Sequence, residues 1–296
     1  MKTMTSIIAA TDLSDAAQYA AERAAIVAKE QQARLNLLHV ISDSALRDLR
    51  RLFHAPAEVE AKLIDDARGM LRDLAASMGQ KTGMEASADV KTGQVLAEIL
   101  SASESADLVV LGAHGATPLR DLMLGSTAER LLRTCTRPML VAKRLPHAGY
   151  EQVIVGVDFS PYSAPALNMA RRIAPGARIA IVHAFRVPFE ARLRIAGAAD
   201  DTIQRYCEEQ RQDAVKRIRD LIRESKDDAY RISFAVEHGD PSRVILAKEE
   251  ELSADLIVIG KHGQSQVEAL LLGSVTRHVL TGSKCDVLVV HEREQV

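Results

Sequence analysis

Short apolar runs alternate along the chain with longer segments in which apolar residues recur every three or four positions. In the first half we interpret five such runs as buried strands: Ser6–Ala10, Leu35–Ile41, Met84–Val90, Leu108–Leu111 and Met139–Ala142. Helical spacing between them predicts helices that start after Ser14 and at Val59–Met78, Val95–Ser103 and Ser126–Thr134. Continuous Val/Ile/Leu strands between amphipathic helices are typical of a parallel sheet covered on both faces.

The second half repeats this pattern and also repeats the sequence. Its strands are predicted near Val153–Val157, Ile179–Ala184, Arg231–Val236, Leu256–Ile259 and Val287–Val290. Residues 107–115 (DLVVLGAHG) return as residues 255–263 (DLIVIGKHG), at an offset of 148, whereas Asp12 matches Asp158 at a slightly smaller one. A period of nearly 150 residues is too long for a solenoid. We therefore predict two domains, 1–146 and 150–296, with a linker within Arg144–Glu151.

The repeated order of strands and helices predicts an α/β fold. Because parallel crossovers are right-handed, each half should be doubly wound and Rossmann-like, with a five-stranded parallel sheet.

Composition excludes several classes of protein. Hydrophobic residues make up 47% of the chain and charged residues 26%, with a net charge of −2, as in an ordinary globular protein. Aromatic residues at 3%, with no Trp and no basic excess, argue against a nucleic-acid partner. No apolar run could cross a bilayer, no signal peptide is recognisable, and the three cysteines form no CxxC pair. We expect a cytoplasmic protein with no membrane partner, no disulfide and no metal site.

Candidate chemistry follows the first and fourth strands of each half, where open parallel sheets bind ligands. An aspartate, Asp12 or Asp158, comes after the first strand and can accept from a ribose hydroxyl or the adenine edge. After the fourth strand come Gly-x-x-Gly, nine residues, and Gly-Ser at a helix start. Glycines let amides approach a ligand, and a helix start favours phosphate. The alternative, that the glycines only make turns and Ser126 and Ser274 only cap helices, is disfavoured by the repetition.

This pattern resembles the nucleotide loop of the universal stress protein family, and the resemblance covers essentially the whole chain, twice. The closing apolar strands, PMLVA at 138–142 and CDVLVV at 285–290, are similar too. The resemblance implies the strand order 3-2-1-4-5 in each domain, which places Asp12 opposite Gly112–Gly115 and Asp158 opposite Gly260–Gly263. It also implies an adenine nucleotide site in each half.

Matching the family's motif residue by residue gives two candidate sites. The first consists of Asp12, Val40, Gly112, Gly115, Gly125, Ser126 and Thr127. The second consists of Asp158, Ala184, Gly260, Gly263, Gly273, Ser274 and Val275. Lys261, where the first half has Ala113, is a further candidate contact to the phosphates of the second site.

The resemblance further implies a stress-response protein that binds ATP, or ADP or AMP in its place, with Mg²⁺ as an optional companion of the phosphates. It would act as a nucleotide-dependent switch or sensor read by an unidentified protein partner. We expect no catalytic residue and at most slow hydrolysis, because His114 and His262 have no recurrent acidic partner and no GxxxxGK[ST], GxGxxG or GxSxG motif occurs. Two alternatives stay open: an adenylating or ATP-pyrophosphatase-like enzyme, and a nucleotide-free interaction scaffold.

The two fifth strands, Met139–Ala142 and Val287–Val290, are apolar and without charges, so an open edge there would invite aggregation. The resemblance implies pairing along this edge, which a tandem chain can satisfy internally. We therefore expect an intramolecular domain pair, and homodimerisation of the whole chain stays open.

Overall fold

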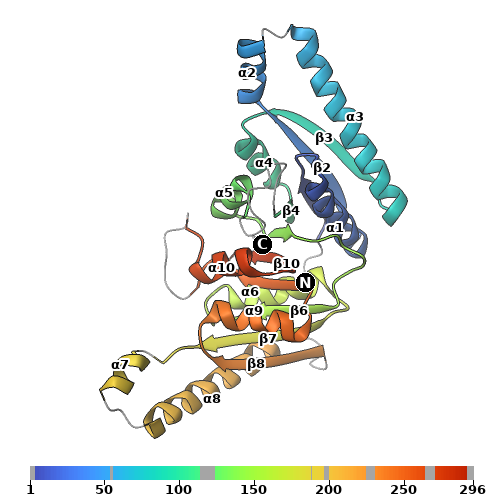
Figure 1. Ribbon diagram of the computed structural model, residues 1–296. Helices are drawn as coiled ribbons and strands as arrows, with labels where there is room; N and C mark the ends of the chain where they lie inside the picture. Colours follow the sequence, from blue (N-terminus) through green and yellow to red (C-terminus); the bar gives the residue numbers. More distant parts are fainter. Residues whose placement is uncertain are drawn as a thin grey trace. The chain divides into compact units, whose positions relative to one another are not determined.

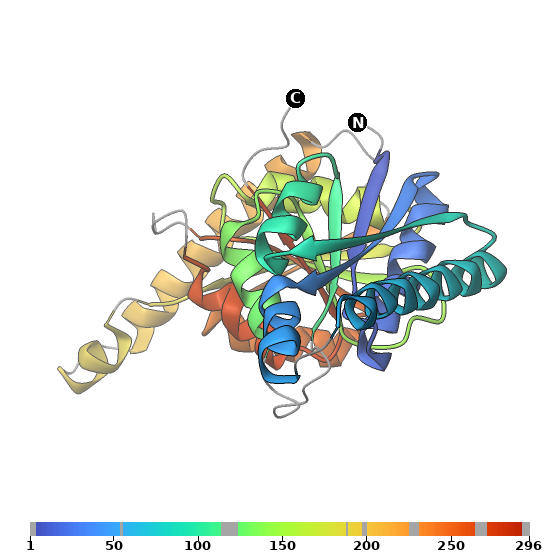
Figure 2. The ribbon, with the colours of Figure 1, turned by 90° about the horizontal axis from the view of Figure 1, so that it is seen from above.

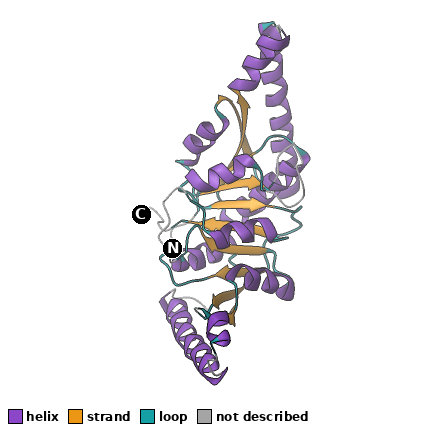
Figure 3. Cartoon of the chain, turned by 60° about the vertical axis from the view of Figure 1, so that its left-hand side comes forward, coloured by secondary structure: helices purple, strands orange, loops and turns teal. Residues whose placement is uncertain are grey.

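The computed structural model describes residues 4–53, 56–113, 124–187, 189–196, 200–224, 231–263 and 271–291. These residues form two compact units. The first contains the described residues of 4–149, Leu271 and residues 284–289; the second contains those of 150–263, together with 272–283 and 290–291. Each unit has a mostly parallel sheet with helices packed against it (Figure 1, Figure 3). The predicted α/β class is confirmed.

The first unit has the predicted strand order. Its elements in chain order are β1 (Ser6–Ala10), α1 (Asp15–Gln31), β2 (Arg34–Ser42), α2 (Asp43–Phe53), α3 (Ala57–Thr82), β3 (Ala86–Gly93), α4 (Val95–Ser103), β4 (Leu108–Gly112), α5 (Ser126–Thr134) and β5 (Met139–Ala142). Strands run in the order β3-β2-β1-β4-β5, all parallel. Helices α1 and α3 lie together on one face of the sheet, and α4 and α5 on the other (Figure 1, Figure 2).

A strand from the second sequence repeat completes the first unit. Residues 287–289 of β10 (Asp286–Val290) pair antiparallel with β5, in the register Val287↔Val141 and Val289↔Met139. Every residue of β5 and β10 is buried. The predicted pairing of the two fifth strands is therefore present.

The second unit repeats the same order from its own first strand. Its elements are β6 (Gln152–Gly156), α6 (Ser163–Ile173), β7 (Arg178–Phe185), α7 (Glu190–Ile195), α8 (Asp200–Glu224), β8 (Ile232–His238), α9 (Pro241–Leu252), β9 (Leu256–Gly260) and α10 (Ser274–Gly282). Its strands run β8-β7-β6-β9, all parallel. Helix α6 packs on β6 and β9, α8 on β7 and β8, and α9 on β6, β7 and α10.

Local sequence signals explain where several helices begin and end. The Ser14 side chain caps α1 by accepting from the Ala17 amide, as predicted, and Gly83 ends α3 with a left-handed φ of 72°. Asp240 caps α9, with Pro241 at its first position. Helices α2 and α7 were not predicted. Strand β2 passes directly into α2 without an intervening Gly or Pro, so no local stop signal separates them.

The predicted state of the cysteines is confirmed. Cys135 and Cys285 are buried, Cys207 is half-buried, and all three are free thiols. Within the described part of the chain, no helix combines the length and apolarity required to cross a membrane.

A buried ion pair connects distant parts of the sequence within the first unit. Asp286 is fully buried, and its Oδ2 accepts from Arg23 Nε at 2.9 Å, while its Oδ1 accepts from the Lys143 amide at 2.9 Å. Arg23, on α1, is 4% exposed and also donates to the Ala148 carbonyl at 2.8 Å. This cluster joins α1, the end of β5 and the start of β10.

Candidate functional site

Strand register places the ends of the first, second and fourth strands of each half side by side. Ala10, at the end of β1, pairs with Leu38 of β2 and with Leu111 of β4, and the Thr11 amide donates to the Leu38 carbonyl at 2.9 Å. In the second unit Gly156 pairs with Val182, and the Val157 amide donates to the Val182 carbonyl at 2.9 Å. Because these strands are parallel, Asp12 and Asp158 each follow the strand end at the edge where the glycine loop begins.

Each aspartate lies in a tight turn with an unusual backbone. Oδ1 of Asp12 accepts from the Ser14 amide at 3.1 Å and from the Ser14 hydroxyl at 2.6 Å. Oδ1 of Asp158 accepts from the Ser160 amide at 3.0 Å. The residue after each aspartate is left-handed, with φ of 63° at Leu13 and 62° at Phe159. Non-glycine residues in this region store strain that often marks functional sites, and here the same strain occurs twice.

A histidine from the second strand fixes each turn. Nδ1 of His39 lies 2.8 Å from the Thr11 carbonyl oxygen, and Nδ1 of His183 lies 2.8 Å from that of Val157. Both rings are half-buried and hydrogen-bonded. These histidines position the turn, so their geometry favours a structural role.

In the second unit, Phe159 of the turn that contains Asp158 packs against an aromatic ring and a guanidinium group. The Phe159 ring lies 4.5 Å from that of His183, and the Arg217 guanidinium of α8 lies 4.1 Å from the Phe159 centroid. Burial lowers the pKa of His183 below its usual 6.5, although the Val157 carbonyl and the Asp158 carboxylate act in the opposite direction. In the first unit Leu13 takes the place of Phe159 and packs against an apolar cluster around Ile41 and Ala67.

The two glycine loops are closed in the same way. We call the described residues 112–113 and 124–126 the first glycine loop, and residues 260–263 and 272–274 the second. The Gly125 amide donates to the Ala113 carbonyl at 2.9 Å, and the Gly273 amide donates to the Lys261 carbonyl at 3.0 Å. Each bond joins the two ends of a loop, so the helix start is held beside the end of the fourth strand.

The glycines, and not the serines, occupy the N-cap positions. Gly125 caps α5 and Gly273 caps α10, neither with a side-chain cap hydrogen bond, so Ser126 and Ser274 are the first helical residues. Both serines are exposed. The alternative in which they serve as helix caps is therefore wrong, and the helix starts retain amides that suit an anion.

The second loop faces its aspartate directly. A Cβ atom at Gly263 would lie 2.8 Å from Oδ2 of Asp158, which confirms that this aspartate stands opposite the loop. A Cβ at Gly260 would lie 2.5 Å from Cβ of Tyr162, so close packing requires glycine there. Lys261 is 4% exposed and does not extend into solvent.

Charge differs between the two helix starts. The first turn of α5 contains Glu129, which pairs with Arg133 at 2.6 Å. The corresponding residue of α10, at the offset of 148, is the exposed Arg277, and its first turn has no acidic residue. The first turn of α10 therefore has a cationic residue where that of α5 has an acidic one, and Lys261 stands where the first half has Ala113.

The other residues of the two candidate sites lie near the carboxyl ends of these strands or at the helix starts, except for Gly115, which the structure does not describe. Asp12 and Thr127 are exposed, whereas Val40, Gly112, Ala184 and Val275 are half-buried. Gly115, like His114, lies outside the described residues. Sequence reasoning missed Tyr162 and Thr276, whose side chains contact the second loop. Neither residue is repeated in the first half, where Ala16 and Ala128 stand, so a search for repetition could not find them.

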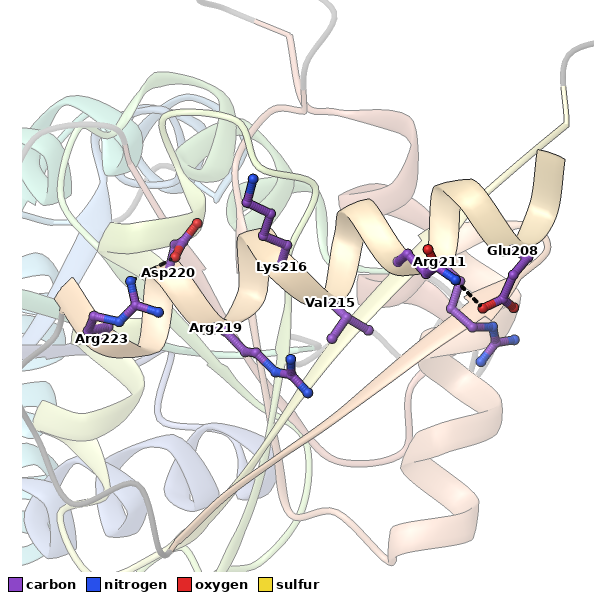
Figure 4. A pocket seen from close by; sticks show the side chains of 8 residues that line it. Glu208, Arg211, Val215, Lys216, Arg219, Asp220 and Arg223 are labelled. Atoms are coloured by element: carbon purple, nitrogen blue, oxygen red, sulfur yellow. Dashed lines mark hydrogen bonds and ion pairs between the residues drawn. The ribbon is translucent and has the colours of Figure 1, made fainter. Parts of the chain in front are cut away.

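A surface hollow elsewhere contains none of these residues. One face of α8 lines it, with Arg211, Lys216, Arg219 and Arg223 beside Glu208 and Asp220 (Figure 4). Asp220 pairs with Arg223 at 3.1 Å, as expected for a solvated helix face. Among the described residues, no group of three or more His, Cys, Asp or Glu side chains could hold a metal ion.

Fold and site together define a tandem, doubly wound α/β protein with an aspartate and a closed glycine loop at one edge of each half. The model of the universal stress protein family matches residues 4–143 and 149–291. The chain therefore belongs to the universal stress protein family, as the resemblance indicated.

Individual relatives match along most of the chain. A universal stress protein of Mycolicibacterium smegmatis is 25% identical over 299 residues, which cover 97% of both chains. Universal stress protein Rv2005c of Mycobacterium tuberculosis is 26% identical over 238 residues, covering 77% of this chain and 78% of the relative. The crystal structure of a universal stress protein from Archaeoglobus fulgidus superposes with a TM-score of 0.72 at 22% identity, covering 97% of this chain and 98% of that one. The last likeness concerns the fold.

Proposed function

We propose that the chain binds an adenine nucleotide in each half and acts in the cytoplasm as a nucleotide-dependent switch or sensor of a stress response. The aspartate would accept from the ribose or the adenine edge. The glycine loop and the Gly-Ser helix start would hold the ribose and the phosphates.

One observation carries the proposal: the 2.8 Å approach of the Gly263 Cβ position to Asp158 Oδ2. It brings the carboxylate and the loop backbone together at one edge of the sheet. The left-handed residues after both aspartates and the two matching loop-closing bonds support the same arrangement in each half. Family membership adds to this support.

The second site is expected to favour ATP over AMP more strongly than the first. Lys261 and Arg277 add positive charge where the first half has Ala113 and Glu129. Charge-assisted contacts to phosphate are roughly twice as strong as neutral ones. Mg²⁺ bound to ATP would be held through the phosphates.

We propose no catalytic role for the site. His262 lies in the second loop, but it is 8% exposed and packs edge-on against Tyr162, with ring centroids 5.7 Å apart. A general base must reach the proton that it abstracts. Any hydrolysis of ATP should therefore be slow.

The test is to identify and count the nucleotide released when freshly purified protein is denatured, and then to titrate ATP by calorimetry. We expect about two adenine nucleotides per chain, one for each glycine loop. The double variant Gly115→Val and Gly263→Val should abolish binding, because a Cβ at Gly263 already meets Asp158.

Each alternative predicts a different result. Unchanged ATP affinity in the double variant would disprove the site assignment. Absence of nucleotide and of binding heat would favour the interaction scaffold. Rapid turnover of ATP with release of pyrophosphate would favour the adenylating or ATP-pyrophosphatase-like enzyme.

A further inference from the structure

We propose that Tyr162 and Thr276 are positioning residues that hold the second glycine loop in its binding shape before nucleotide arrives. As a result, the second nucleotide site binds more tightly than the first and fills first. This inference rests on the proposed function, because it concerns how the two sites of one chain divide the nucleotide between them.

Thr276 connects the two ends of the second glycine loop. Its side chain is 2% exposed, and its Oγ1 donates to the Gly260 carbonyl at 2.7 Å. A Cβ at Gly273 would lie 3.5 Å from the same hydroxyl oxygen, so Thr276 also packs on the start of α10. A hydrogen bond shielded from water in this way holds its geometry better than an exposed one.

Tyr162 packs on the second glycine loop from the start of α6. It precedes the first residue of α6, and its Cβ and Cγ lie 2.5 Å and 3.1 Å from the Cβ position of Gly260. Its ring meets that of His262 edge-on, at 62°. His262 is 8% exposed and Lys261 is 4% exposed. The second loop is consequently held from α6 and from α10.

The first half cannot make either contact. Ala128 stands where the second half has Thr276, and Ala16 stands where it has Tyr162. Alanine has neither a hydroxyl nor a ring, so within the described residues the first loop keeps the bond between its two ends but has no counterpart of these two side-chain contacts. A loop that is already ordered costs less free energy to bind a ligand, because less conformational entropy is lost. The second site therefore has the lower Kd for the same nucleotide.

The experiment measures ATP binding at each site separately. Gly115→Val leaves the second site and Gly263→Val leaves the first; calorimetry in these backgrounds gives the two Kd values. Adding Thr276→Ala to the Gly115→Val background should raise the Kd of the second site about fivefold, the value of one buried neutral hydrogen bond. Thr276→Ser, which keeps the hydroxyl, should restore it. Tyr162→Ala should also raise this Kd, and Tyr162→Phe, which keeps the ring, should raise it less than Tyr162→Ala does.

Two controls separate positioning from general loss of structure. Thr276→Ala in the Gly263→Val background should leave the Kd of the first site unchanged. Without nucleotide, the Lys261 and Gly273 amides should exchange hydrogen faster in Thr276→Ala than in the unmodified protein, while the Gly125 amide keeps its rate. Equal Kd values at the two sites, or a Thr276→Ala variant that binds like the unmodified protein, would overturn this inference alone. If the unmodified chain binds no nucleotide, the proposed function fails with it.

Discussion

Removing the carboxylate of Asp286 should destabilise the first unit strongly. Asp286→Ala leaves the Arg23 guanidinium, 4% exposed, without the carboxylate that lies 2.9 Å from its Nε. Breaking a buried pair by removing one partner costs about 3–5 kcal/mol when the remaining charge is left uncompensated, and the Glu30 carboxylate, whose pKa burial raises and Arg23 lowers, places this loss at the lower end of that range. The Lys143 amide, 2.9 Å from Oδ1, loses its acceptor as well. Since whole domains are stable by only about 5–15 kcal/mol, this loss would be a large share of the total.

The assay is urea unfolding followed by far-UV circular dichroism, because the chain has no Trp to report by fluorescence. The double variant Arg23→Met and Asp286→Leu replaces both charges with apolar side chains. It should lose less than Asp286→Ala, since such replacements are often nearly neutral. Asp220→Ala is the matched surface control: its pair with Arg223 has exposed fractions of 46% and 77%, and its loss should stay below about 1 kcal/mol. A loss below about 1 kcal/mol for Asp286→Ala, or a double variant less stable than the single one, would refute the reasoning.

Three further predictions concern single side chains. Lys261→Ala, which gives the second loop the alanine of the first, should reduce the preference of the second site for ATP over AMP and make its ATP affinity less dependent on salt. Titrations at low and high salt that match the unmodified site would contradict this prediction. Because burial lowers the pKa of His183, the unfolded chain binds more protons than the folded chain just below pH 6.5. The free energy of unfolding should therefore decrease as the pH falls through this range. NMR titration of the ring should give a pKa below 6.5, and His183→Gln should flatten the acid side of the unfolding profile; a pKa at or above that value would disprove the assignment. Burial raises the pKa of Glu30 above its usual 4.5, so the free energy of unfolding should fall as the pH rises above that value. Glu30→Gln should remove this pH dependence, and an unfolding profile that the substitution leaves unchanged would contradict the prediction.

The fold could be predicted from sequence because its signals are local and occur twice. Helices α4 and α5 and strands β1 and β5 have the predicted bounds, since apolar runs and a Gly-Ser helix start mark them. Helix α2 was missed because no breaker separates it from β2. The pairing of β5 with β10 was predicted from the family resemblance together with the cost of leaving two apolar edges open.

The candidate sites were found by repetition, and this method has a definite limit. It found both aspartates and both glycine loops, but it gives no signal for a residue that lies outside the matched motif and differs between the halves, such as Tyr162 or Thr276. Contacts made only in the folded state gave no signal either. Arg23 and Asp286 are 263 residues apart, and nothing near either of them in sequence indicates the other.

The first unit contains a strand from the far end of the sequence, and this affects how it folds during synthesis on the ribosome. Residues 284–289, of which 287–289 pair with β5, are made after all of residues 150–283. At synthesis rates of about 5–20 residues per second, β5 waits on the order of ten seconds for its neighbour. During that interval the nascent chain carries an apolar strand edge able to pair with other chains. A translation stop at any point between residues 150 and 283 would leave this edge open permanently, so truncated products should be more prone to aggregation than the complete chain.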